Sequence, residues 1–386
     1  MNNKPLRLLV VAGEASGDLH GGNLTRALRD LVPGLVMEGA GGENMRKTGV
    51  SILFDINKMG AVGIVELAGS LLHHLKIYRT LSAAIAQKKY DAAILVNYPG
   101  LNLRLAKRCK EAGCPVFFFI SPQVWVMDRG RVKAISKTAT KMYVLLPFEE
   151  KIYKDAGVDV EYHGHPFVDI LMPENSREDF LRGLGLDPGN KTVGLLPGSR
   201  LNEINTLLDD MLAAAAIIKK EIPNCQFILP VADTIDPAHI HKKLGENRLE
   251  VKVVTQKAYS VMAASDFLIV ASGSATLEAG MFACPMVIIY QIHPATHRLF
   301  RFFGKIDHFG LVNILAGDRI VPELLNENAN AENIAAEALL VLKDPERHSA
   351  VKAKLIAMRQ TLGDPGVTQR IAQSIASQME RTVNAR

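Results

Sequence analysis

The sequence predicts an α/β protein built from two doubly wound, parallel sheets. Three observations support this fold class. Short apolar runs alternate with segments of helical periodicity along the whole chain. Turns rich in glycine and small residues follow several of these runs, as is typical of the carboxyl ends of parallel strands. A stretch rich in Pro, Asn, Gly and charge, residues 173–191, divides the apolar runs into two groups and marks the expected domain border.

The composition suits a globular protein of two domains. The 386 residues are 48% hydrophobic and 22% charged, which argues against disorder and allows each half to bury a core. A net charge of +5 is too small for a typical nucleic-acid binder. It suits an anionic substrate or a membrane surface, although scattered lysines without such a role explain it equally well.

Cysteine usage and the apolar runs indicate the compartment. The four cysteines lack zinc-ligand spacing and indicate thiols in a reducing environment. The N-terminus leads directly into a strand, and its apolar run is too short for a signal peptide. Because no apolar run approaches the ~20 residues of a spanning helix, we expect a cytoplasmic protein whose membrane contact, if any, is peripheral.

In the first half, residues 7–12 are expected to form a strand, followed by a loop with the sequence GEASGD at 13–18 and a helix ending near Pro33. Glu14 and Asp18 occupy the place where a dinucleotide site would hold pyrophosphate, which two carboxylates would repel. They suit sugar hydroxyls or a general base. An N-cap made by Asp18 is an equally good explanation of that residue.

Three further strands are expected at 91–96, 116–120 and 141–146. Each ends in a polar or proline-containing tail, and a glycine loop at 39–42 follows another strand. Ligands of open parallel sheets bind beyond the carboxyl ends of the strands, so these tails are expected to face one crevice. His163 and His165 flank a glycine shortly afterwards and suit either a base or a structural turn.

Residues 59–79 carry a broad apolar stripe at helical spacing with basic residues at its far end. A core-facing helix is the common explanation of such a stripe. The alternative is a lipid-facing helix, which its glycines favour slightly because they weaken an ordinary long helix. The residues expected to contact acyl chains or a membrane here are Val62, Val65, Leu67, Leu71, Leu72 and Leu75.

The second half repeats the alternation, with strands expected at 193–196, 227–230, 251–254, 268–271 and 286–290. Pro197 and Gly198 end the first of these strands, and a helical pattern resumes at Glu203. Backbone N–H groups in such a turn, together with the helix dipole, attract anions, and Arg200 can bind two phosphate oxygens. The alternative is a surface connection in which Arg200 pairs with Glu203.

A second small-residue turn follows the strand at 268–271 and reads SGSAT at 272–276. Glu278, one turn into the next helix, is too acidic to lie beside phosphate but suits hydrogen bonds from ribose hydroxyls. Two such turns in one α/β unit predict a nucleotide-sugar site.

Residues 291–310 mix basic and aromatic side chains, a pattern that favours an interfacial surface, with aromatic packing under the sheet as the alternative. The residues expected to contact a membrane are Arg298, Arg301, Phe302 and Phe303. We expect three parts of the chain: a first domain at 1–172, a second at 173–343, and a helical tail at 344–386 that crosses back to the first.

With these motifs placed, the chain resembles the lipid-A-disaccharide synthase family along nearly its full length. The matching motifs are GEASGD (13–18), ISPQVW (120–125), LPFE (146–149), GHP (164–166), LPGSR (196–200) with Glu203-Ile204, SGSATLE (272–278) and NILAG (313–317). The resemblance implies a GT-B glycosyltransferase, with two Rossmann-like domains facing a central cleft.

By resemblance, the protein joins UDP-2,3-diacylglucosamine to 2,3-diacylglucosamine 1-phosphate with inversion, giving a β-1,6 disaccharide and UDP. The family also implies peripheral location at the inner membrane, acyl-chain contacts along 59–79, a homodimer through the tail, and neither a metal nor another cofactor. Leaving UDP is then stabilised by Arg200 and helix N-terminal N–H groups. The residues expected to bind UDP-sugar are Gly198, Ser199, Arg200, Glu203, Ser272, Gly273, Ser274, Ala275, Thr276, Glu278 and Asn313.

One departure from the family falls at residues 97–102, which read NYPGLN where the family usually has D-x-P-D-F-N. The first aspartate is the family's candidate general base, and here it is Asn97. An amide can orient a hydroxyl but cannot deprotonate it, and losing a general base typically costs ~10²–10⁴-fold in rate. A second tryptophan expected after Trp125 is also missing. Both changes fall on the acceptor side.

Three hypotheses follow from this departure. The first, which we favour, is a working synthase in which Glu14, Asp18 or Asp128 supplies the base. The second is a related glycosyltransferase with the same donor type and a different acceptor. The third is a catalytically weak nucleotide-sugar-binding paralogue with a regulatory role.

Overall fold

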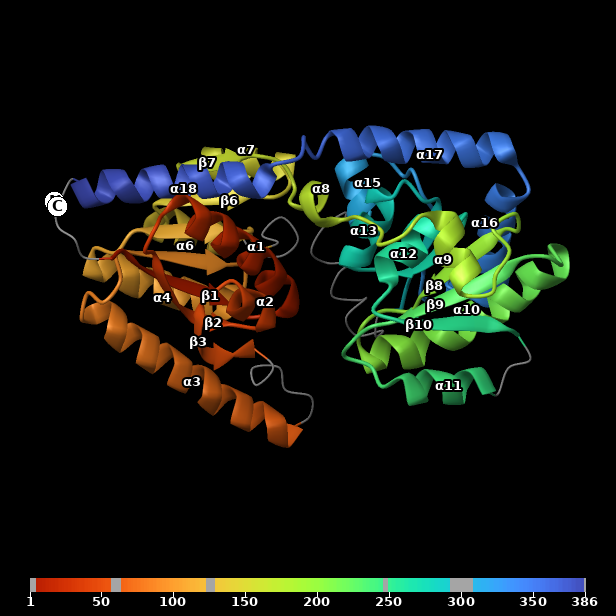
Figure 1. Ribbon diagram of the computed structural model, residues 1–386, viewed down its shortest axis with the longest axis horizontal. Coiled ribbons are helices and arrows are strands. Elements are labelled where there is room, and N and C mark those ends of the chain that lie inside the picture. The colour runs from red at the N-terminus through yellow and green to blue at the C-terminus, as the bar shows by residue number, and fades with distance from the viewer. Residues whose placement is uncertain (1–4, 57–63, 123–128, 246–248, 292–307, 385–386) are drawn as a thin grey trace. The chain divides into compact units, whose positions relative to one another are not determined.

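The fold was analysed in a computed structural model. The structure describes residues 5–56, 64–122, 129–245, 249–291 and 308–384; for 64–72, 129 and 382–384 it describes the backbone alone. The chain divides into two compact units. The first comprises Met1–Asp169 and Leu362–Arg386, and the second comprises Ile170–Thr361 (Figure 1).

The first unit contains a seven-stranded sheet in the order β3-β2-β1-β4-β5-β6-β7, and all its strand pairs are parallel. The strands are β1 (Arg7–Ala12), β2 (Val36–Gly41), β3 (Ser51–Asp55), β4 (Ala92–Val96), β5 (Val116–Phe119), β6 (Lys141–Val144) and β7 (Val160–Tyr162). The helices are α1 (Ala15–Leu31), α2 (Glu43–Lys47), α3 (Ile64–Ala86), α4 (Pro99–Ala112), α6 (Arg129–Thr138), α7 (Pro147–Asp155), α8 (Phe167–Ile170) and α18 (Val367–Asn384).

Both faces of this sheet are covered, which explains why its central strands β1, β4 and β5 are nearly continuous apolar runs rather than alternating patterns. Leu9 and Val11 of β1 pack with the cluster that includes α3 and α4, whereas Leu8 and Val10 pack with the cluster that includes α1 and α18. Figure 1 shows α3 on one side of the sheet, with α1 and α18 side by side on the other. Helices on both faces leave the ends of the strands as the surface where polar side chains can gather.

The second unit contains a six-stranded parallel sheet in the order β10-β9-β8-β11-β12-β13. Its strands are β8 (Thr192–Leu196), β9 (Gln226–Val231), β10 (Val251–Thr255), β11 (Phe267–Ala271), β12 (Met286–Tyr290) and β13 (Glu323–Leu325). Its helices are α9 (Arg177–Gly183), α10 (Leu201–Glu221), α11 (Pro237–Gly245), α12 (Ala258–Ala264), α13 (Ser274–Met281), α15 (Leu311–Ala316), the 3₁₀ helix η2 (Asn326–Asn328), α16 (Ala331–Leu342) and α17 (Pro345–Gln360). The predicted fold class, two doubly wound parallel sheets, is confirmed.

Several helices begin earlier than expected. α1 starts at Ala15 rather than Leu19, α10 at Leu201 rather than Glu203, and α13 at Ser274 rather than Leu277. In α1 and α13 the small residues expected in a loop form the first helical turn, because Ser and Gly are accepted there as well as in loops. In α10 the two additional residues are Leu201 and Asn202. The segment from 344 onward forms two helices, α17 in the second unit and α18 in the first.

The predicted stripe at 59–79 is described only in part. Val62 lies outside the described residues, and only the backbone is described for Val65, Leu67, Leu71 and Leu72, which lie on α3. Leu75 is 38% exposed. Further along α3, Ile77, Leu81 and Ile85 are buried at intervals of four residues and face the sheet. The end of α3 is therefore an ordinary core-facing helix.

Candidate functional site

Each sheet has a point where the strand order reverses, and the candidate residues follow the strands at these two points. In the first unit β1 pairs with β4, and Ala12 lies opposite Val96. In the second unit β8 pairs with β11, and Leu196 lies opposite Val270. Ligands of open α/β sheets bind beyond the carboxyl ends of the strands at this point. The chain therefore has one such place in each unit.

In the first unit this geometry brings Glu14 and Asn97 together. The Asn97 side-chain amide donates a 2.6 Å hydrogen bond to the Glu14 carboxylate, and the Ser16 hydroxyl donates to the same oxygen at 3.1 Å. Glu14 is exposed at the N-cap of α1. A solvent-accessible carboxylate is thus oriented by an amide and a hydroxyl.

The turn after β4 is held in an unusual backbone conformation. Asn97 and Tyr98 both have left-handed φ, at 43° and 49°. The buried Asn102 side chain holds this turn by donating to the carbonyl oxygens of Asn97 at 2.7 Å and Val96 at 3.1 Å. Only glycine fits at position 13, because a Cβ there would lie 2.1 Å from the Tyr98 ring. Two loops distant in sequence are therefore packed directly against each other.

Tyr98 also connects this site to α3. Its hydroxyl lies 2.5 Å from Nε2 of His74, and the two rings are stacked. Burial, and then the charge of Glu14, raise the pKa of Tyr98. Sequence reasoning did not single out His74 or Asn102 for this site. For Asn102, the final asparagine of the family motif D-x-P-D-F-N could have indicated a role.

Asp18, in contrast, is buried and fully engaged. Its carboxylate accepts hydrogen bonds from the backbone N–H groups of Gly42 (2.6 Å), Asn44 (2.9 Å) and Met45 (3.2 Å), and from the Asn44 side chain (2.9 Å). Asp18 therefore does not cap its own helix, as one interpretation held; that N-cap is Glu14. The glycine loop expected at 39–42 is largely strand, since β2 extends to Gly41, and Asp18 holds Gly42 and the start of α2 against α1. Of the two acids in the GEASGD motif, Glu14 is therefore the accessible one. Asp128 lies outside the described residues.

His20 of α1 and His165 are buried, and burial favours the neutral form of both rings. The rings of His20 and His165 lie 6.2 Å apart, edge to face, and both contact Phe167. Burial lowers the pKa of His20 to about 4. Burial, and then His20, lower the pKa of His165 well below its usual range. His163 instead lies 2.8 Å from Glu161. Of the two roles expected for this motif, a base or a structural turn, the buried position of His165 fits the structural one.

In the second unit, the turn after β8 gathers hydrogen-bond donors around one carboxylate. The backbone N–H groups of Ser199 and Arg200 donate to one oxygen of Glu203, at 3.1 and 3.2 Å. The Arg200 guanidinium donates to the other at 2.6 Å. Gly198 has a φ of +109°, and a Cβ there would lie 2.3 Å from the Glu203 carboxylate. Three donors thus converge on one anion, and Arg200 pairs with Glu203 as the second interpretation anticipated.

Thr234, which sequence reasoning missed, braces this turn from the loop after β9. Its hydroxyl donates a 2.6 Å hydrogen bond to the carbonyl oxygen of Ser199. Thr234 lies in an exposed loop after β9, where the sequence has no pattern that would predict this contact.

The second turn of this unit leads directly into α13, with Gly273 as the N-cap. The backbone N–H of Ser272 donates a hydrogen bond to the carbonyl oxygen of Ile289. The hydroxyl of the buried Thr276 donates one to the carbonyl oxygen of Gly273, at 2.8 Å. Gly273 and Ser274 are exposed, and Ala275 is half-buried. Burial raises the pKa of Glu278, opposed by a hydrogen bond from Ser274. Thr276 therefore shapes the turn, while the exposed residues remain accessible.

Asn313 is buried and has no hydrogen-bonding capacity left. Its amide donates to the carbonyl of Val321 (2.9 Å) and to Glu323 (2.7 Å), and its oxygen accepts from the backbone of Ile320 (3.0 Å) and Val321 (3.1 Å). This side chain therefore ties α15 to the segment before β13. Arg298, Arg301, Phe302 and Phe303 lie outside the described residues.

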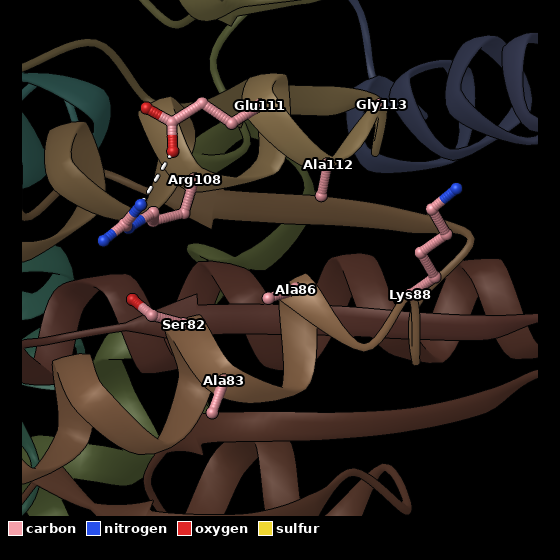
Figure 2. A pocket seen from close by; sticks show the side chains of 8 residues that line it. All are labelled: Ser82, Ala83, Ala86, Lys88, Arg108, Glu111, Ala112 and Gly113. Atoms are coloured by element: carbon pink, nitrogen blue, oxygen red, sulfur yellow. Dashed lines mark hydrogen bonds and ion pairs between the residues drawn. The ribbon is translucent and has the colours of Figure 1, made fainter.

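A cavity of about 640 Å³ lies elsewhere in the first unit, between the last turns of α3 and α4. Figure 2 shows Arg108 and Glu111 of α4 paired with each other on one side of it, Ser82, Ala83 and Ala86 of α3 on the other side, and Lys88 at one end. Asn97 immediately precedes the start of α4, so this cavity lies at the opposite ends of the strands from Glu14 and Asn97. It is separate from the candidate site.

The described parts of the chain contain neither a cluster of metal-binding side chains nor a helix able to span a membrane. Within residues 5–56, 64–122, 129–245, 249–291 and 308–384, no group of three or more His, Cys, Asp or Glu side chains could hold a metal ion. The helices in these same ranges are all too short or too polar to cross a membrane.

Comparison with known structures shows the same fold at low sequence identity. A UDP-GlcNAc 2-epimerase from Neisseria meningitidis, bound to UDP-GlcNAc, aligns with a TM-score of 0.66 and 12% identity over 96% of this chain and all of that one. MurG from Acinetobacter baumannii aligns with a TM-score of 0.60 and 11% identity over 97% of this chain and all of the other. These likenesses support the two-domain glycosyltransferase architecture expected from the sequence.

Comparison with sequences identifies the family. The family model for lipid-A-disaccharide synthetase matches residues 8–377. The lipid-A-disaccharide synthase of Syntrophus aciditrophicus is 41% identical over 96% of this chain and 97% of its own. That of Geobacter metallireducens is 42% identical over 95% of each chain. The chain therefore belongs to the lipid-A-disaccharide synthetase family and is a UDP-sugar-dependent glycosyltransferase of lipid A biosynthesis.

Proposed function

We propose that this enzyme transfers the sugar of UDP-2,3-diacylglucosamine to 2,3-diacylglucosamine 1-phosphate, with inversion, to form a β-1,6 disaccharide 1-phosphate and UDP. The observation that carries the proposal is the family match over residues 8–377, at about 41% identity to a named synthase. The resemblance of both glycine turns of the second unit to the family's donor motifs supports the choice of donor.

On the donor side, we assign the diphosphate to the turn formed by Gly198, Ser199 and Arg200. Two backbone N–H groups and a guanidinium lie within hydrogen-bonding distance of a single carboxylate there, so the same donors can serve phosphate oxygens. Such fixed donors stabilise the charge that develops on leaving UDP and provide this stabilisation without a metal. We assign the ribose to Glu278 and the uridine side to the exposed start of α13.

On the acceptor side, we assign the general base to Glu14. Of the two candidate acids that the structure describes here, Glu14 is the accessible one, whereas Asp18 accepts four hydrogen bonds in the interior. The acceptor's 6-hydroxyl oxygen bonds to C1 of the donor sugar as the bond from C1 to the UDP oxygen breaks. The hydroxyl proton passes to Glu14, and the electron pair leaves on UDP.

Asn97 then acts as a positioning residue rather than a base. Its amide holds the Glu14 carboxylate at 2.6 Å and leaves the other carboxylate oxygen to face the substrate hydroxyl. Glu14 belongs to the GEASGD motif that the chain shares with the family, so with Asn97 in place of the aspartate this turn still keeps one carboxylate. Asn97 is thus compatible with a working synthase, and the similarity to named synthases does not favour a different acceptor or a regulatory paralogue.

We further propose a peripheral location at the inner membrane, with acyl-chain or membrane contacts along residues 59–79 and 291–310, and a homodimer. The exposed Leu75 side chain supports an apolar contact on α3. Sedimentation with vesicles of anionic phospholipid tests the location, and sedimentation velocity tests the dimer. A protein that stays in the supernatant in the first experiment argues against the membrane contact.

A product assay tests the proposed function. Purified enzyme is mixed with UDP-2,3-diacylglucosamine and 2,3-diacylglucosamine 1-phosphate, with and without EDTA, and products are separated by chromatography and mass spectrometry. We expect disaccharide 1-phosphate and UDP in equal amounts, and the same rate with EDTA. UDP binding without any disaccharide would contradict the proposed acceptor, and loss of product with EDTA would contradict a metal-independent reaction.

A further inference from the structure

Glu203 occupies the donors that the proposed function assigns to the diphosphate. The Ser199 and Arg200 N–H groups and the Arg200 guanidinium all donate to its carboxylate. The carboxylate also fills the space that Gly198 leaves open, since a Cβ there would lie 2.3 Å from it. A phosphate bound at this turn requires both the same donors and the same space.

Charge also prevents Glu203 from staying in place when a diphosphate arrives. A carboxylate within hydrogen-bonding distance of these N–H groups would lie against the phosphate oxygens, and like charges at this range repel. Glu203 therefore cannot be a direct ligand of UDP through the contacts it makes in the structure. It must either release the turn or weaken binding.

The interaction that must break is weak enough to be exchanged. The Arg200 side chain is 79% exposed and that of Glu203 is 27% exposed. Ion pairs so open to water are screened and contribute little to stability. The turn itself does not depend on Glu203 alone, because Thr234 braces the Ser199 carbonyl from another loop. Release of the carboxylate thus leaves the turn supported.

We propose that Glu203 is an internal competitor for the donor diphosphate. Its carboxylate keeps the anion-binding turn and Arg200 organised and then yields these groups to UDP-sugar. When the reaction is complete, its return to the turn promotes the release of UDP. This inference rests on the proposed donor site and assigns Glu203 a role opposite to that of a UDP ligand.

Binding of a ligand series to wild type and Glu203→Gln tests the inference. Isothermal titration with uridine, UMP and UDP separates nucleoside from phosphate contributions. Glutamine keeps the shape of the side chain and removes its charge, so we expect UDP to bind on the order of five- to tenfold more tightly. The affinity for uridine should not change. UDP should inhibit the product assay at a correspondingly lower concentration.

Glu221→Gln is the matched control, because Glu221 lies at the other end of α10 and pairs with Lys343 at 2.6 Å. It should leave UDP affinity unchanged. Unchanged or weaker UDP binding by a folded Glu203→Gln variant overturns the inference, as it would indicate an organising role or none. Failure of the wild type to bind UDP would instead overturn the proposed donor site, so the two failures are distinguishable.

Discussion

Glu14 and Asp18 differ in their surroundings although both belong to the motif GEASGD. Glu14 is exposed and oriented by Asn97, whereas Asp18 is 2% exposed and accepts four hydrogen bonds. The sequence could identify both acids and place them at a strand end. It could not separate their roles, because Asp18 takes its partners from residues 42–45, more than twenty positions away.

Asp18→Asn is expected to affect stability rather than chemistry. An asparagine at this position can accept with one oxygen, but its NH₂ group would face backbone N–H groups that then lack a partner. Such losses typically cost about 2–4 kcal/mol. Denaturant unfolding should show this loss, while the fraction that remains folded should keep its turnover number. A variant with full stability and no activity would contradict the structural role and return Asp18 to the candidates for the base.

At the scale of elements, the strands were predicted more closely than the helix starts. Buried strands show as continuous apolar runs, so β1, β4, β8 and β11 follow directly from the sequence. The observed starts of α1 and α13 lie earlier than expected because small residues and glycine suit both loops and first helical turns. The contact of α1 with the segment at 165–167 had no local signal at all.

The burial of His20 in this contact predicts that the folded protein loses stability at acid pH. His20 of α1 has a pKa of about 4 in the folded protein, below the ~6.5 of an unfolded histidine. Between these values the unfolded chain binds the extra proton, so the free energy of unfolding falls as pH drops from 6.5 to 4. The loss attributable to His20 is about 3 kcal/mol.

His20→Phe keeps a ring against Phe119 and Phe167 and removes the proton-binding site. Denaturant unfolding at a series of pH values should show a smaller decline for this variant than for wild type. The variant retains a residual decline because His165 is also buried and neutral. Parallel curves for the two proteins would show that His20 does not carry the effect.

At the scale of the whole molecule, the two parallel sheets and the family follow from the sequence, because local patterns and ordered motifs run along the chain. The hydrogen bond between Glu14 and Asn97 on the acceptor side does not follow from the sequence. In the sequence, Asn97 shows only that the family's candidate base is missing. The parallel pairing of β1 with β4, with Ala12 opposite Val96, is what brings Glu14 next to Asn97. The departure from the family motif and the carboxylate that it contacts thus belong to different loops.

The measurement that tests this account most directly is the rate of disaccharide formation by four proteins: wild type, Glu14→Gln, Asn97→Asp and the double variant Glu14→Gln/Asn97→Asp. We expect Glu14→Gln to lose ~10²–10⁴-fold in rate without losing stability, because it removes the base. The double variant should regain much of that loss, since it exchanges the amide and the carboxylate between the two positions. A Glu14→Gln enzyme as fast as wild type, or a double variant no faster than Glu14→Gln, would contradict the assignment of Glu14 as the base.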